Sequence, residues 1–90
     1  MLVNNINRRI NLETREVEIG NLVYENITYL INNSGINKSI FAKKINKTPQ
    51  ALNKILYDLR RGNISLKNLS LISDGLNVNI SSLFDEFDRD

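Results

Sequence analysis

The sequence predicts an all-α protein of five short helices with a short N-terminal extension. Three observations lead to this prediction. Apolar residues recur at helical spacing from about residue 21 onward. Capping residues and glycines separate the periodic stretches. The composition, 41% hydrophobic and 24% charged, is that of an ordinary globular protein. We expect one domain at residues 21–87, an arm or short β-extension at residues 1–20, and an acidic tail at residues 88–90.

The N-terminal extension contains a short strand-like pattern. Val17 and Ile19 would face one way and Glu16 and Glu18 the other, which is the alternation of a strand. The residues before them could form an extended partner or an irregular arm. Because two strands alone are marginally stable in water, we expect the extension to pack on the domain or on a second chain.

The five helices have recognisable start signals. We predict them at about residues 21–33, 38–45, 49–61, 66–75 and 79–84. Asn21, Asn37 and Thr48 are plausible N-caps, because their side-chain oxygens can accept from the unpaired N–H groups of a first turn. Pro49 suits the first position of the third helix, where its missing N–H leaves no partner unsatisfied.

Glycine and asparagine mark the predicted helix ends. Ser34–Gly35 would stop the first helix, and Gly75 would end the fourth. Asn46 follows the second helix at a turn position that needs left-handed backbone, which asparagine tolerates next best after glycine. Gly62 suits a left-handed cap after the third helix.

Charge is segregated along the chain, although the net charge is only +2. Between Gly35 and Gly62 there are seven bases and one acid, a local net charge of +6. From Asp85 to the end there are four acids and one base, a net charge of −3. Lysines can simply solvate helix surfaces, but here they coincide with two short helices joined by a tight turn. That coincidence favours a phosphate-binding face.

Several classes of function are excluded by what the chain lacks. It has neither cysteine nor histidine, so disulfides, thiol chemistry, zinc sites and Ser-His triads are not available. No Gly-rich phosphate loop or nucleophile–base pair is visible, and we expect no enzyme activity, metal or cofactor. There is no apolar run long enough for a bilayer and no signal-peptide core, so we expect a cytoplasmic protein.

Four runs of residues match a known family in order and at roughly its spacing. They are Gly35-Ile36-Asn37-Lys38, Phe41-Ala42-Lys43-Lys44-Ile45, Thr48-Pro49-Gln50-Ala51-Leu52-Asn53-Lys54-Ile55 and Leu76-Asn77-Val78-Asn79-Ile80-Ser81-Ser82-Leu83-Phe84. Over about two-thirds of its length the chain therefore resembles the lambda-repressor-like, Xre/Cro-type helix-turn-helix domains. The resemblance implies that the second helix anchors on the backbone of double-stranded DNA while the start of the third enters the major groove.

The resemblance also implies which residues meet DNA. Base contacts would come from Pro49, Gln50, Asn53 and Lys54. Phosphate contacts would come from Lys38, Lys47, Thr48, Arg60 and Arg61. The chemistry agrees, since Gln or Asn can bond N6 and N7 of adenine and Lys can reach the acceptors of guanine. Two alternatives stay open: Thr48 could be purely a helix cap, and Asn53 a solvated surface amide.

The chain departs from the family pattern in three places. The segment after the third helix is longer than usual, which suggests that this helix is extended. Apolar Ile40, Leu56 and Tyr57 stand where polar residues are more common, so a second subunit or the N-terminal extension would cover them. In that extension, Arg8 and Arg9 could enter a minor groove or could belong to a packed arm.

The function expected from these features is that of a sequence-specific transcriptional regulator. We expect a homodimeric repressor of phage or mobile-element type that binds a palindromic operator. The alternative is a protein-binding module of the same fold, such as an inhibitor of a host enzyme or an antitoxin. Its interface would combine the acidic tail with the three apolar side chains.

Overall fold

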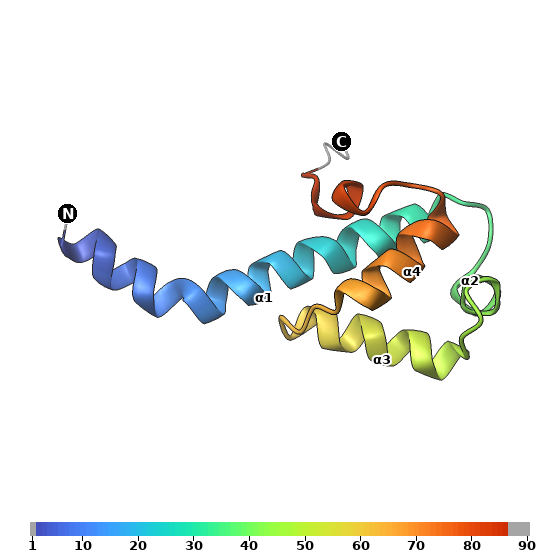
Figure 1. Ribbon diagram of the computed structural model, residues 1–90, viewed down its shortest axis with the longest axis horizontal. Coiled ribbons are helices and arrows are strands. Elements are labelled where there is room, and N and C mark those ends of the chain that lie inside the picture. The colour runs from blue at the N-terminus through green and yellow to red at the C-terminus, as the bar shows by residue number, and fades with distance from the viewer. Residues whose placement is uncertain (1, 87–90) are drawn as a thin grey trace.

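The computed structural model describes the backbone of residues 2–86 and the side chains of residues 15–86. In chain order the elements are α1 (Leu2–Asn32), α2 (Lys38–Lys44), α3 (Pro49–Arg60), α4 (Leu66–Leu76) and the 3-10 helix η1 (Ile80–Phe84) (Figure 1). Every regular element within this part of the chain is helical, which confirms the all-α class. The predicted fifth helix is the short η1. The predicted acidic tail at residues 88–90 lies outside the described residues.

The N-terminal prediction is corrected by α1. Residues 15–19 are helical rather than extended, and the first helix begins at Leu2 instead of near Asn21. The physical reason is that an alternation of five residues is too short to outweigh an uninterrupted helix on either side of it. The side chains of Arg8 and Arg9 lie outside the described side chains. Whether residues 1–20 act as a separate unit stays a prediction.

The core forms where the C-terminal half of α1 meets the other helices, while the N-terminal end of α1 projects away from them (Figure 1). Its buried side chains are Val23, Ile27 and Ile31 of α1, Phe41 and Ala42 of α2, Leu52, Leu56 and Leu59 of α3, Leu69 and Ile72 of α4, and Leu83 of η1, together with Ile45 after α2. Burial of these apolar surfaces stabilises the arrangement of all five elements. None of the described helices is long and apolar enough to cross a membrane.

Buried Asn26 ties the C-terminal end of the domain to α1. Its Nδ2 donates to the backbone oxygen of Leu83 at 2.9 Å and to that of Asp85 at 2.7 Å. Because a buried amide is costly unless it is hydrogen-bonded, these two bonds fix η1 and the residue after it against α1.

Glycine allows close helix contacts at two places. Gly20 of α1 lies against the backbone of Leu59, and a Cβ on Gly62 would stand 3.2 Å from backbone atoms of Glu16 and Val17. The backbone of α1 is therefore in direct contact with the backbone at the end of α3, with no side chain between them. Gly62 has φ +86, which confirms the predicted left-handed cap.

Gly75 does not end α4 as predicted. The helix continues to Leu76, and left-handed Asn77, with φ 61, caps it. A Cβ at Gly75 would lie 2.5 Å from Ile45 Cγ2 and 3.1 Å from the Phe41 ring. The glycine is therefore explained by the close packing of α4 on α2 and not by a helix stop.

Candidate nucleic-acid interface

The α2 and α3 helices form a tightly joined pair. Asn37 Oδ1 accepts from the backbone N–H of Ile40 at 2.9 Å and caps α2. Asn46 has φ 60, which confirms the left-handed turn position predicted from its side chain. The N–H of Lys47 then donates to the oxygen of Ala42 at 2.8 Å, closing the turn before α3 begins.

The start of α3 is built as predicted. Thr48 Oγ1 accepts from the N–H of Ala51 at 3.0 Å, and Pro49 occupies the first helical position. The capping role of Thr48 is therefore confirmed. Its hydroxyl hydrogen does not take part in this bond, so the cap leaves one donor for another partner.

The outward face of α3 is polar and its inward face is apolar. Leu52, Leu56 and Leu59 are buried, whereas Gln50 and Asn53 are exposed. Neither of these two amides makes a side-chain hydrogen bond within the described part of the chain. Both can therefore offer donor and acceptor together to an external partner.

Lys54 also lies on the outward face, where it pairs with an acid. Its Nζ is 3.3 Å from Asp58 Oδ2, and the Lys54 side chain is 76% exposed. A surface ion pair of this kind is weak, so it does not prevent Lys54 from reaching another acceptor.

Each arginine at the end of α3 is held by a tyrosine. The guanidinium carbon of Arg60 lies 5.0 Å from the ring centroid of Tyr24 in α1. Arg61 lies 5.6 Å from the ring of Tyr57, and its Nη1 donates to the Tyr57 hydroxyl at 3.0 Å. This hydrogen bond is the main reason that the pKa of Arg61 is raised above its usual value.

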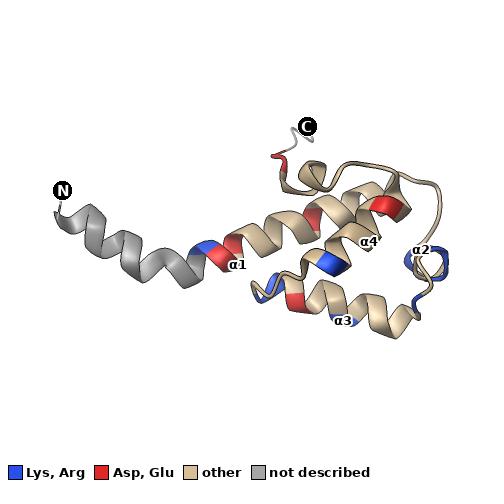
Figure 2. Cartoon of the chain, in the orientation of Figure 1, with Lys and Arg blue, Asp and Glu red and all other residues tan. Residues whose placement is uncertain are grey.

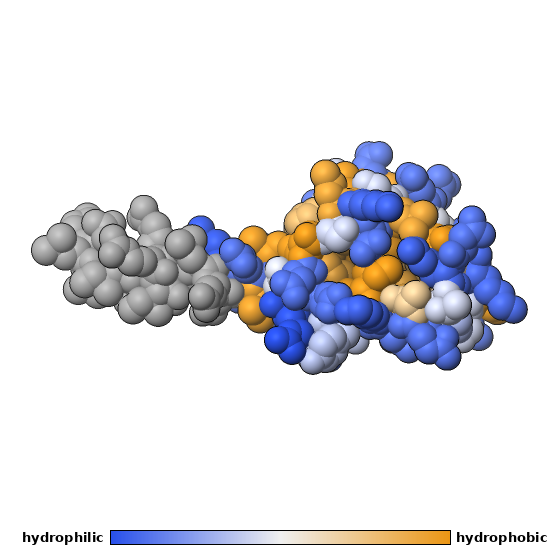
Figure 3. Space-filling view, turned by 60° about the horizontal axis from the view of Figure 1, so that its bottom comes forward, coloured by the Kyte–Doolittle hydropathy of each residue, from blue (hydrophilic) through white to orange (hydrophobic). Residues whose placement is uncertain are grey.

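The predicted phosphate-binding residues lie at several points of this surface. Lys38, Thr48, Arg60 and Arg61 are exposed, and Lys47 is half-buried. Lysine and arginine gather on α2 and toward the ends of α3, whereas α1 carries more acids than bases from residue 15 onward (Figure 2). When the α3 side is turned toward the viewer, hydrophilic residues cover the lower and right-hand edges around a hydrophobic middle (Figure 3).

The predicted surface of Ile40, Leu56 and Tyr57 is corrected at one residue. Leu56 is only 3% exposed and belongs to the core, because its spacing from Leu52 and Leu59 places it on the inward face of α3. Ile40 is 51% exposed and Tyr57 is 58% exposed. Leu56 therefore cannot contribute to a contact with a second subunit.

Tyr24 was not identified from the sequence as a site residue. Together with Lys38, Asn53, Leu56, Tyr57 and Arg60 it lines a shallow hollow of about 170 Å³ between α1, α2 and α3. No sequence signal identifies this group, because its members come from three helices and meet only in the folded chain.

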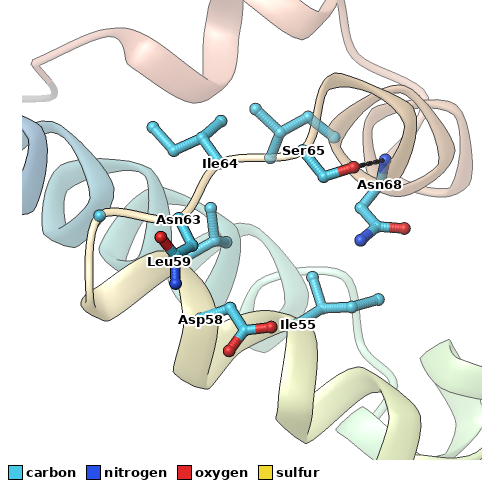
Figure 4. A pocket seen from close by; sticks show the side chains of 9 residues that line it. Ile55, Asp58, Leu59, Asn63, Ile64, Ser65 and Asn68 are labelled. Atoms are coloured by element: carbon cyan, nitrogen blue, oxygen red, sulfur yellow. Dashed lines mark hydrogen bonds between the residues drawn. The ribbon is translucent and has the colours of Figure 1, made fainter.

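A second hollow, of about 370 Å³, lies between the end of α3 and the start of α4 (Figure 4). Its lining includes Ile55, Leu59, Ile64 and Leu69, with Asp58 at one side. Ser65 Oγ accepts from the N–H of Asn68 at 3.3 Å at its edge. Asp58 is the one ionisable side chain in the lining, so the hollow lacks a pair of groups for acid–base chemistry. Among the described residues, no three acidic side chains converge on a possible metal position.

A comparison with known protein families agrees with the helix-turn-helix arrangement of α2 and α3. A family model described as helix-turn-helix matches residues 29–83, from the end of α1 to η1. No curated protein and no solved structure matched the chain. The matched residues include both helices, the turn and the polar face described above, and they make up more than half of the chain. The chain therefore belongs to the lambda-repressor-like, Xre-type helix-turn-helix family of DNA-binding domains.

Proposed function

We propose that the protein is a sequence-specific transcriptional regulator that reads the major groove of duplex DNA with α3. The observation that carries this proposal is the exposure of Gln50 and Asn53, both unpaired within the described chain, on the first turns of a capped helix. Either amide can form two hydrogen bonds with adenine, and Lys54 can approach guanine. Each good base contact of this kind contributes about 1–3 kcal/mol of discrimination.

The basic residues of the helix pair would supply affinity for DNA that is independent of base sequence. Lys38, Lys47, Arg60 and Arg61, together with the hydroxyl of Thr48, are proposed to bind phosphates. The Thr48 hydroxyl can cap the helix and donate to a phosphate at the same time.

We further propose that the protein acts as a homodimeric repressor of phage or mobile-element type. One domain of this size contacts few base pairs, so two copies are needed for high affinity. Two half-sites about 34–36 Å apart, or a multiple of that spacing, would fit a symmetric dimer. Exposed Val17 and Ile19 on α1, 38% and 37% exposed, are candidate contacts between copies, as is Ile40 on α2. Sedimentation of Ile19→Glu beside the unmodified protein tests the first of these surfaces.

A protein-binding role is the second candidate, and one observation favours it. Ile64, which lines the hollow of Figure 4, is 38% exposed, and Leu66 at the start of α4 is 71% exposed. Exposed apolar groups of this kind can mark a protein contact. The burial of Leu56 removes one residue of the surface first considered for such a partner.

Binding to duplex DNA at several salt concentrations separates the two candidates. With about four to eight phosphate contacts, the slope of log K against log salt should be roughly −4 to −7. Fluorescence anisotropy with a labelled random duplex measures this slope. No binding even at low salt would reject the DNA-binding proposal and leave the protein-binding role.

A further inference from the structure

The hollow between α1, α2 and α3 has an unusual lining. Tyr24, Lys38, Asn53, Tyr57 and Arg60 surround it, and Leu56 contributes its apolar part. Each of the five polar side chains can donate a hydrogen bond, and no acid is among them. Such a lining favours an anion with several acceptor oxygens over a neutral or cationic group.

Two cations from different helices face this space. Lys38 comes from α2, and Arg60 comes from the last turn of α3. Arg60 is stacked on the ring of Tyr24 at 5.0 Å, so its guanidinium is already positioned before any ligand binds. An arginine that is held in place loses less conformational freedom when it binds an anion.

The size and openness of the hollow suit one phosphate group of a polymer. Its volume of about 170 Å³ is more than ten times the roughly 10–15 Å³ that one water molecule needs. It adjoins the outward face of α3 through Asn53 and Tyr57, so a strand running along that face would pass over it.

We propose that this hollow is a seat for a single phosphodiester of the DNA backbone, clamped between Lys38 and Arg60 and steadied by Tyr24. The proposal rests on the proposed function, and it adds to that function a phosphate contact partly made by α1. Tyr24 lies before the family match, which covers residues 29–83. The seat therefore links the long N-terminal helix directly to DNA binding.

A scan with neutral backbone groups tests the seat. In a bound duplex, one phosphate at a time is replaced by an uncharged methylphosphonate, and affinity is measured by anisotropy for the unmodified protein, Lys38→Gln, Arg60→Gln and Lys44→Gln. Lys44→Gln is the matched control, because it removes the same charge from α2 at an exposed position outside the hollow. All three substituted side chains are exposed and are replaced by a polar one, so folding should be preserved.

At one backbone position the replacement should lower the affinity of the unmodified protein for the duplex about tenfold. The same replacement should lower the affinity of Lys38→Gln and Arg60→Gln only about twofold, because in these variants the phosphate has already lost one of its charged partners. Lys44→Gln should show the same loss, about tenfold, as the unmodified protein. The seat is refuted if all four proteins lose the same factor at every position, or if Lys44→Gln behaves like the two hollow variants. Failure of the unmodified protein to bind any duplex would instead refute the proposed function itself.

A competition experiment distinguishes a DNA phosphodiester from a free phosphate. At constant ionic strength, inorganic phosphate should release the duplex no better than chloride does, because one small anion does not share the groove contacts of α3. If inorganic phosphate binds the unmodified protein through Arg60 and the duplex still binds with unchanged affinity, the hollow binds free phosphate apart from DNA and the proposal is wrong.

Discussion

The two faces of α3 differ in what their side chains do: the inward face packs in the core, and the outward face is free to bind a partner. The inward face holds Leu52, Leu56 and Leu59 in the core, where they are at most 3% exposed. The outward face holds Gln50 and Asn53, which are exposed and contribute little to the core. If the outward face recognises DNA as proposed, stability and recognition depend on different side chains of one helix, and single substitutions should separate them.

The largest expected effect is on the inward face. Leu52→Ala removes a fully buried side chain, and the loss of packing should lower the free energy of unfolding by about 2–5 kcal/mol. Urea denaturation followed by circular dichroism measures it. Leu66→Ala makes the same change at a leucine that is 71% exposed, and it should cost less than about 0.5 kcal/mol. Equal losses in the two variants would show that the burial assigned to Leu52 is wrong.

The next effect lies on the outward face. Gln50→Ala should leave the free energy of unfolding within about 0.5 kcal/mol, yet it should lose about 1–3 kcal/mol of discrimination at one base pair. Binding to single-base variants of a preferred duplex measures this loss. Asn79→Ala is the control, because Asn79 is exposed, lies away from α3 and makes no side-chain capping bond. A similar loss in both variants would argue against base recognition by Gln50.

A smaller effect is expected at Thr48, the N-cap of α3. Thr48→Ala removes the acceptor for the N–H of Ala51 and should cost about 1 kcal/mol of stability. Thr48→Ser keeps the hydroxyl and should recover most of that loss. Thermal unfolding of both variants tests the cap. If serine and alanine proved equally destabilising, the hydroxyl would not be the group that matters.

The smallest effect concerns the ion pair on the outward face. Asp58→Asn removes the carboxylate beside Lys54 and should change stability by less than about 0.5 kcal/mol. Affinity for duplex DNA should rise slightly, since one repulsive charge is lost, whereas Asp74→Asn on α4 should raise it less. A fall in affinity for Asp58→Asn would mean that the pair holds Lys54 in its binding position.

The helix-turn-helix could be predicted from the sequence because its signals are local. Asn37 and Thr48 accept bonds from backbone groups three residues ahead, so short windows of sequence are enough to locate both helix starts. Asn46 and Gly62 occupy left-handed positions that their residue types favour. The residues expected to contact DNA came from the resemblance to the family, and their roles stay predictions.

The features that were missed depend on contacts between distant parts of the chain. The stacking of Arg60 on Tyr24 joins α3 to α1 and has no pattern in sequence. Gly75 was interpreted as a helix stop, but the close approach of Ile45 explains it. Leu56 could have been placed correctly, because its spacing from Leu52 and Leu59 already follows the buried stripe.

The most direct test of the account is a map of backbone amide signals by nuclear magnetic resonance during titration with a duplex selected from a random pool. We predict the largest shifts at Lys38, Gln50 and Asn53, with little change at Leu66 and Phe84. Shifts centred on α4 or on the acidic C-terminal end, with the start of α3 unchanged, would contradict recognition by the outward face of α3.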